Sequence, residues 1–368
     1  GRVAPADAVG ESLSWPIEYR DEYSLGLYAN SQYGLVYSKF HNRLLSLDLA
    51  SGTPALLDAA QFTHVTGAQH AIDGVTGASE QLLDAVVLSQ DSHTLFATVK
   101  LAGDNPGNTV GIYRGDSSDM ANLPIRTAAN FVAGSEFYPY PKVRCTALSP
   151  DGSRLATGGE DNQIHLLNSA GLSELATLNL GGVVRSVAFS QDGRTLYAGI
   201  AKNGTQSAAI VVLAVSDSGV SELARYAESA TPIQLLPLHS GTALAYVLSA
   251  STRYGVLDVT TPAKPTLLHS YQAGGKVTAL TETPDGQALL VATNNRLVER
   301  VDARTLQGTP APVRVASLTL APNAIAAPKA NAWLVGVKNG LQPIQYQASQ
   351  IRSLDAAALA SWQSSHRP

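Results

Sequence analysis

Three charged residues occupy one repeated position in the sequence, eight residues before the end of a predicted tight turn. They are Asp84, Arg144 and Arg185. Two guanidinium groups beside one carboxylate leave a net positive charge, and guanidinium groups bind carboxylates and phosphates through charge-assisted hydrogen bonds. Tyr138 and Tyr140, in the aromatic and proline-rich segment before Arg144, could cover such a site. We therefore predict that these five residues bind a ligand with an anionic group. The alternative is that the three charged residues only form an ion-pair network.

The histidines and the single cysteine are weaker candidates for chemistry. His64, His70 and Asp73 lie in a glycine-rich stretch, but their spacing matches no compact metal-ligand pattern. The sequence contains no haem-attachment motif, nucleophile elbow, phosphate-binding loop or dinucleotide-binding glycine motif. Cys145 lies in a predicted strand and is expected to be a small buried side chain. The sequence therefore predicts no catalytic residue, no metal site and no cofactor.

The elements that must position these residues are repeated hairpins. In residues 183–199, a strand rich in β-branched and aromatic residues is followed by the turn pair Asp192-Gly193 and a second strand. Close copies end their turns at Gly152 and Gly286. Weaker copies end their turns at Gly34, Ser92, Gly241 and Asn331. Successive turn ends are 41 to 60 residues apart, a period typical of a β-propeller with four short strands in each blade.

The two most regular repeats carry a resemblance to a known family. Residues 184–193 and 146–158 resemble the repeats of WD-repeat proteins and of related bacterial seven-bladed propellers of the YVTN-like type. The resemblance covers nearly the whole chain, although no repeat ends in Trp-Asp and none has the Gly-His pair of WD repeats. It implies an all-β, seven-bladed β-propeller of four-stranded antiparallel blades. Propellers of this type include lactonases, cytochrome-d1-like and quinoprotein-like domains and binding scaffolds, so the resemblance specifies the fold more closely than the function.

The predicted propeller occupies residues 12–353. Residues 1–11 are expected to form an N-terminal tether. Residues 354–368 are expected to form a short C-terminal helical tail, because the stretch 353–362 is rich in alanine and contains neither glycine nor proline. A closed ring leaves no unpaired blade edge at the junction of the two chain ends. We therefore expect a strand within residues 12–20 to close the ring by pairing near residues 341–351.

Inserted segments fall on one face of the predicted propeller. They are residues 58–81, 102–108, 132–142 and 201–207. Each either precedes an innermost strand or joins a second strand to a third, which places it opposite the Asp-Gly turns. Loops on a rigid scaffold commonly carry binding residues. We therefore predict that this loop-rich face is the functional surface, with Asp84, Arg144 and Arg185 at the mouth of the central channel.

Composition limits the classes of partner. Of 368 residues, 45% are hydrophobic and 15% charged, and the net charge is -4. No basic stripe suggests a nucleic-acid partner, and no run approaches the roughly 20 apolar residues of a membrane span. The chain begins with Gly1 rather than Met, so we expect a processed periplasmic or secreted protein, with a lipid anchor on a removed N-terminus as a further option. We expect it to be a monomer.

These observations favour a non-catalytic scaffold of the bacterial cell envelope that binds a protein, a peptide or an anionic small ligand on its loop-rich face. The alternative is a lactonase-like hydrolase in which Asp84, Arg144 and Arg185 supply catalytic groups at the channel mouth. No nucleophile with an obvious general base is apparent, which favours a binding scaffold over an enzyme. A redox or cofactor-carrying propeller is a third class, but the dispersed histidines do not favour it.

Overall fold

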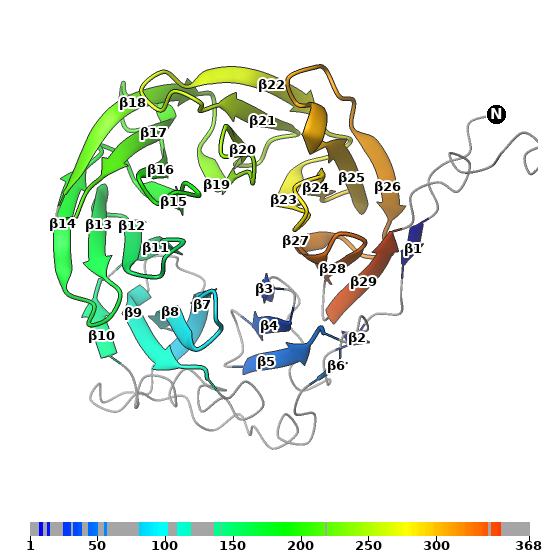
Figure 1. The fold of residues 1–368 in the computed structure, drawn as a ribbon, viewed down its shortest axis with the longest axis horizontal. Coiled ribbons are helices and arrows are strands. Elements are labelled where there is room, and N and C mark those ends of the chain that lie inside the picture. Colours follow the sequence, from blue (N-terminus) through cyan, green and yellow to red (C-terminus); the bar gives the residue numbers. More distant parts are fainter. Residues whose placement is uncertain are drawn as a thin grey trace, which may run out of the picture.

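The protein is a ring of seven antiparallel β-sheets around a central axis, as the repeats predict (Figure 1). The computed structural model describes residues 7–9, 13–14, 25–30, 32–38, 43–50, 55–56, 81–101, 109–118, 136–140, 142–217, 219–337 and 340–346. In each of the first six blades the four strands follow one another in the chain from the axis to the rim.

Blades one to three fill the first half of the ring. Their strands are β3 (Leu25–Ala29), β4 (Tyr33–Ser38), β5 (Arg43–Asp48), β6 (Ala55–Leu56), β7 (Gln81–Leu88), β8 (Thr94–Leu101), β9 (Thr109–Asp116), β10 (Glu136–Pro139), β11 (Val143–Leu148), β12 (Arg154–Gly159), β13 (Gln163–Asn168) and β14 (Glu174–Asn179).

Blades four to six repeat the arrangement. Their strands are β15 (Val184–Phe189), β16 (Thr195–Ile200), β17 (Ala208–Val215), β18 (Val220–Glu228), β19 (Pro232–Pro237), β20 (Ala243–Leu248), β21 (Arg253–Asp258), β22 (Thr266–Gln272), β23 (Val277–Glu282), β24 (Ala288–Thr293), β25 (Leu297–Asp302) and β26 (Val313–Ser317).

The seventh blade joins the two ends of the chain. Its strands β27 (Pro322–Lys329), β28 (Ala332–Val337) and β29 (Gly340–Tyr346) are completed by the N-terminal strands β1 (Asp7–Val9) and β2 (Leu13–Ser14), which both pair with β29. The prediction of ring closure by an N-terminal strand is therefore confirmed. The pairing begins earlier than predicted, because β1 lies within the segment 1–11 that was expected to be a tether. Residues 15–20 and the expected C-terminal helix at 354–368 lie outside the described residues.

The turns between first and second strands explain the repeated sequence phrase. In blade four the Ser190 hydroxyl donates a hydrogen bond of 2.6 Å to Oδ1 of Asp192, which also accepts one of 3.0 Å from the Arg194 N–H. Gly193 has a φ of 71°, in the left-handed region that favours glycine. The same arrangement recurs at Asp91, Asp151 and Asp285. We call the face that carries these turns the turn face and the opposite one the loop-rich face.

The core lies along the second strands and between neighbouring blades. Every residue of β16, β20 and β24 is buried. At Gly199 a Cβ atom would lie 2.3 Å from the carbonyl oxygen of Pro232, the first residue of the next innermost strand. At Gly158 it would lie 2.4 Å from Cγ1 of Val184, which holds the same place in its own blade. Gly158 and Gly199, near the ends of β12 and β16, are therefore required because the next blade approaches them closely.

One predicted insertion is a strand. Residues 132–142 were expected to form an inserted loop, but β10 lies within them and pairs with β9 as the outermost strand of blade two. Phe137, Tyr138 and Pro139 of this segment therefore lie at the rim of the ring. The segment 201–207, by contrast, joins β16 to β17 on the loop-rich face as predicted.

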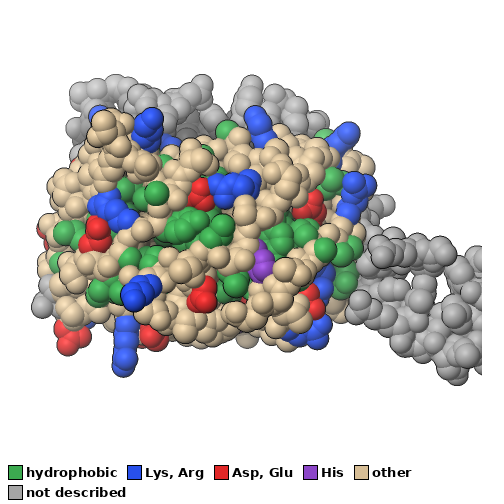
Figure 2. Space-filling view, turned by 90° about the horizontal axis from the view of Figure 1, so that it is seen from above, with side chains coloured by type: hydrophobic (Ala, Val, Ile, Leu, Met, Phe, Trp, Pro, Cys, Tyr) green, Lys and Arg blue, Asp and Glu red, His purple; other side chains and the backbone are tan. Residues whose placement is uncertain are grey.

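Apolar side chains also reach the rim. The outermost strands β18, β22 and β26 expose Leu223, Leu267 and Val313. Figure 2 shows apolar side chains along the middle of this rim, bordered by charged groups above and below. Among the described residues, the helix content is one short 3-10 turn, Ala303–Thr305, and no helix in that part of the chain is long and apolar enough to cross a membrane.

Candidate functional site

The repeated position of the predicted site residues is a β-bulge in the innermost strand. The register of β11 with β12 shifts between Val143 and Cys145, around Arg144. The innermost strands of five other blades shift in the same way, around Asp84, Arg185, Ile233, Thr278 and Asn323. In blade one the register is regular at Gly26. A bulge gives its extra residue a direction that differs from the regular alternation of the strand, and bulges are frequent beside binding sites. The equivalence predicted from turn spacing therefore has a structural basis.

Arg144 is held by an acidic residue of its own blade. Its Nη1 donates a hydrogen bond of 2.9 Å to Oε1 of Glu160, in the loop between β12 and β13. Only 14% of the Arg144 side chain is exposed, so this ion pair is largely withdrawn from water. The charge of Arg144 is thereby offset on the loop-rich face, by a residue that the sequence did not single out.

Arg185 carries a charge that is not offset in this way. Within the described residues its guanidinium group has no hydrogen-bond or ion-pair partner. Partial burial lowers the pKa of Arg185 and repulsion from Arg144 lowers it further, while attraction to Glu160 opposes both effects. Arginine nevertheless stays protonated in proteins and offers five N–H donors in a planar fork. Arg185 is therefore a half-buried cation with free donors next to an existing ion pair.

Asp84 lies at the corresponding bulge of β7, one blade before Arg144. Its side chain is outside the described part of the structure, so its contact with either arginine stays a prediction. The ion pair that the structure does show joins Arg144 to Glu160 within one blade. The alternative of a network running across blades through Asp84 likewise stays a prediction.

Cys145 lies directly after the Arg144 bulge, between blades three and four. Its Sγ is 3.7 Å from the carbonyl oxygen of Gly158 and 3.6 Å from that of Val184. Burial raises the pKa of the Cys145 thiol to about 12, although both arginines oppose this shift. The thiolate, which is the nucleophilic form, is therefore disfavoured at neutral pH. Cys145 was expected to be a small buried side chain; it packs against the apolar cluster between these blades but is only partly buried.

Tyr138 and Tyr140 are not placed over the arginines. Tyr138 lies on β10 at the rim, where its hydroxyl donates to Glu174 and lies 3.1 Å from Nδ1 of His165. Tyr140 is buried, and its hydroxyl donates to Asp161. Burial and these hydrogen bonds raise the pKa of both tyrosines. The prediction that they overhang the channel mouth is wrong, because both side chains join blade two to blade three.

Charged side chains are segregated between the two faces of the ring. The basic residues described on loops and strand ends of the loop-rich face are Lys142, Arg144, Arg185, Lys202, Arg253, Lys276 and Arg296. The acidic residues described there are Glu160, Asp161 and Glu228. The described acidic residues on loops and strand ends of the turn face are Asp48, Asp91, Asp116, Glu136, Asp151, Glu174, Asp192, Asp217, Asp258, Glu282, Asp285 and Asp302. The basic ones are Arg154, Arg194, Lys264, Arg304, Arg314 and Lys329. The described part of the loop-rich face is thus basic although the whole chain is acidic, and its field favours an anionic partner.

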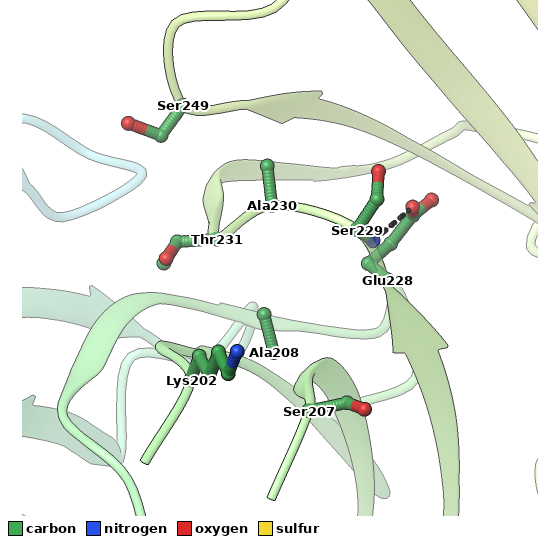
Figure 3. A pocket seen from close by; sticks show the side chains of 8 residues that line it. All are labelled: Lys202, Ser207, Ala208, Glu228, Ser229, Ala230, Thr231 and Ser249. Atoms are coloured by element: carbon green, nitrogen blue, oxygen red, sulfur yellow. Dashed lines mark hydrogen bonds between the residues drawn. The ribbon is translucent and has the colours of Figure 1, made fainter. Parts of the chain in front are cut away.

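A cleft of about 510 Å³ opens on the loop-rich face between blades four and five (Figure 3). It is lined by Lys202, Ser207, Ala208, Glu228, Ser229, Ala230, Thr231 and Ser249. The predicted insertion at 201–207 contributes one wall. The other residues lie at the start of β17, at the end of β18 and in the connections that follow β18 and β20. Only their position in the repeat could have pointed to them.

Within the described ranges, no group of three histidine, cysteine, aspartate or glutamate side chains could hold a metal ion. The glycine-rich stretch with His64, His70 and Asp73 lies outside those ranges.

Comparison with known proteins agrees with the geometry. Residues 136–168 match the family model described as WD domain, G-beta repeat, and this match spans β10 to the end of β13. A chain of the solved structure titled "Crystal Structure of Mitotic Checkpoint Complex" is similar to this one, with a TM-score of 0.65 and 14% sequence identity over 93% of this chain and 96% of that chain. At this identity the likeness shows the seven-bladed fold alone. No curated protein matches the sequence.

Proposed function

We propose that this protein is a non-catalytic β-propeller scaffold whose loop-rich face binds an acidic polypeptide, with Arg185 receiving one of its carboxylates. The observation that carries the proposal is the half-buried Arg185 guanidinium, which has no partner among the described residues and lies beside the Arg144–Glu160 ion pair. A carboxylate placed there would accept charge-assisted hydrogen bonds and offset the repulsion between the two arginines.

Two further observations support a protein or peptide partner. The described residues of the loop-rich face are predominantly basic, and charge complementarity directs and orients association. The solved chain with the same fold comes from a structure whose title names a complex, which agrees with a scaffold role. An anionic small molecule would use the same arginine and is the second form of this proposal.

No observation at this site favours the hydrolase alternative. Two nucleophilic atoms lie next to the arginines in the sequence. The raised pKa of the Cys145 thiol disfavours the reactive thiolate. The Ser186 hydroxyl donates its hydrogen bond to the carbonyl oxygen of Pro232 and has no general base beside it in the described residues. Arg144, which would have stabilised an oxyanion, is already bound to Glu160.

We also propose that the protein is a monomer and that it lies in the bacterial cell envelope or is secreted. The location is supported by the resemblance of the two most regular repeats to bacterial YVTN-like propellers. Light scattering on the purified chain gives the oligomeric state, and a stable dimer would contradict the monomer.

The test uses a fluorescein-labelled hexaglutamate peptide and fluorescence polarisation at low and physiological salt. The wild-type protein is expected to bind it, and binding should weaken as salt rises because the contact is ionic. Arg185→Gln should reduce affinity by about 1.5–3 kcal/mol, the usual value of a hydrogen bond to a charged group.

Arg194→Gln is the matched control, because Arg194 is an exposed arginine on the turn face of the same blade. It should leave the affinity unchanged. Equal affinity of the wild type and the Arg185→Gln variant would exclude Arg185 as the binding group.

A further inference from the structure

The cleft between blades four and five holds polar groups that make no hydrogen bond or ion pair with the described residues. The hydroxyls of Ser207, Thr231 and Ser249 and the ammonium group of Lys202 have no hydrogen-bond or ion-pair partner in the described part of the chain. Figure 3 shows Lys202 and Ser207 on the side of blade four, across from Ser249 of blade five, with Thr231 on the connection between them.

The walls of the cleft are preformed. Glu228 is fixed by hydrogen bonds from Arg253, from the Tyr246 hydroxyl at 2.6 Å and from the Ser229 N–H at 2.9 Å. Only 5% of its side chain is exposed. The small side chains of Ala208 and Ala230 leave the space between the walls open. The shape of the cleft is therefore set by a fixed Glu228 side chain and small neighbouring side chains.

The charge of the lining is positive. Arg253 offsets the carboxylate of Glu228, which leaves the Lys202 ammonium as the uncompensated charge. Three rotatable hydroxyls can each donate a hydrogen bond, and the ammonium group can donate as well. A phosphomonoester has three terminal oxygens and a charge between -1.5 and -2 near neutral pH, so it matches four donors better than the two oxygens of a carboxylate. A neutral sugar would usually need an aromatic surface, and none of the residues that line this cleft is aromatic.

We propose that this cleft binds a phosphomonoester group, held by Lys202, Ser207, Thr231 and Ser249. The group could be carried by a phosphorylated serine or threonine side chain of a polypeptide or by a small phosphorylated molecule. The site shares the loop-rich face with Arg185 but none of its residues, so it stands independently of the function proposed above.

The experiment measures binding to the full chain by isothermal titration calorimetry. The probes are a Gly-phosphoserine-Gly peptide, the same peptide without phosphate, glucose 6-phosphate and glucose. Both phosphorylated probes are expected to bind. Neither unphosphorylated probe is expected to bind. Tighter binding of the phosphopeptide would identify a polypeptide as the source of the group, and tighter binding of glucose 6-phosphate would identify a small molecule.

Lys202→Met is expected to weaken binding of the phosphorylated probes about tenfold or more, because it removes the one uncompensated charge of the lining. Lys264→Met is the control, since Lys264 is an exposed lysine on the turn face. Arg185→Gln should also leave phosphate binding intact, which separates this proposal from the acidic-polypeptide proposal. A melting curve like that of the wild type shows that each variant is folded.

Three results would overturn the proposal. One is absence of binding by either phosphorylated probe. Another is equal affinity of the Lys202→Met variant and the wild type. The third is binding of glucose as tight as that of glucose 6-phosphate, which would assign the cleft to neutral polyols.

Discussion

The Ser186 hydroxyl donates a hydrogen bond of 2.7 Å to the carbonyl oxygen of Pro232, across the junction between blades four and five. Ser186 is the residue directly after the Arg185 bulge. In blade five the corresponding Gln234 makes two hydrogen bonds with the backbone of Leu280 in blade six. In blade three the corresponding residue is Cys145, whose thiol lies 3.6 Å from the Val184 carbonyl oxygen. In blades three, four and five the residue after the bulge therefore connects one innermost strand to the next, whereas in the other three bulged blades it is an alanine.

This relationship predicts opposite effects for two conservative changes. Ser186→Ala should lower the free energy of unfolding by about 1–3 kcal/mol, because it leaves the buried Pro232 carbonyl without its donor. Cys145→Ser should be neutral or stabilising, since a hydroxyl is a stronger donor than a thiol. Urea unfolding followed by circular dichroism gives both values. Loss of stability in Cys145→Ser comparable to that in Ser186→Ala would show that position 145 matters only through packing.

Gly193→Val should destabilise the protein by about 1–3 kcal/mol, because a β-branched residue is forced into left-handed backbone space. A Cβ at this position would meet only Pro150 Cδ, at 3.7 Å, so lack of room is not the cause. The control is Gly171→Ala, since a Cβ there has no atom within 4 Å and the φ of Gly171 is not in the left-handed region. Denaturant midpoints compare the two, and coinciding midpoints for Gly193→Val and the wild type would contradict a requirement for positive φ.

Acid should weaken the turn of blade three. Hydrogen bonds from the Ser149 hydroxyl and from Ser153 lower the pKa of Asp151 from 3.8 to about 2. A carboxyl group whose pKa is lower in the folded state stabilises the fold above the unfolded pKa, and this contribution is lost as pH falls through the folded value. The difference in melting temperature between the wild type and Asp151→Asn should therefore shrink between about pH 4 and about pH 2. A difference that stays constant over this range would contradict a role for the Asp151 charge.

Removing one partner of the Glu228–Arg253 pair should lower the stability of the fold more than removing both. Burial alone would raise the pKa of Glu228, but hydrogen bonds from Arg253 and Tyr246 outweigh it and lower the pKa. Arg253→Met leaves a nearly buried carboxylate without its cation, which typically costs about 3–5 kcal/mol. The double variant Glu228→Gln, Arg253→Met should recover part of this loss. Thermal unfolding at pH 7 measures both, and a double variant no more stable than the single one would contradict the pairing argument.

The innermost part of each blade could be predicted from the sequence because its signals are local. The Ser-x-Asp-Gly turn fixes where the first strand ends, and counting back from it reaches Arg144 and Arg185 at their bulges. The outermost strand of blade two was missed, because the 19 residues 117–135 separate β10 from β9 in the sequence and no local turn signal marks their pairing. Tyr138 was accordingly placed in a loop.

The surroundings of the candidate sites could not be predicted from the sequence. Glu160 reaches Arg144 from a loop after the next strand, and nothing in its sequence context marks it as a partner. The cleft needs side chains from three separate connections, including Lys202 and Ser249. Turn chemistry specifies the strands, whereas the distance between loops of different blades decides which side chains meet.

The recurrence of the bulge in six blades has an evolutionary consequence. A bulged residue makes no regular pair with its neighbouring strand, so the strand keeps its register whatever side chain the bulge carries. Aspartate, arginine, isoleucine, threonine and asparagine already occupy this position in different blades. Ligand preference can therefore change one blade at a time by point substitution, while the turns and glycine contacts that hold the ring together remain untouched.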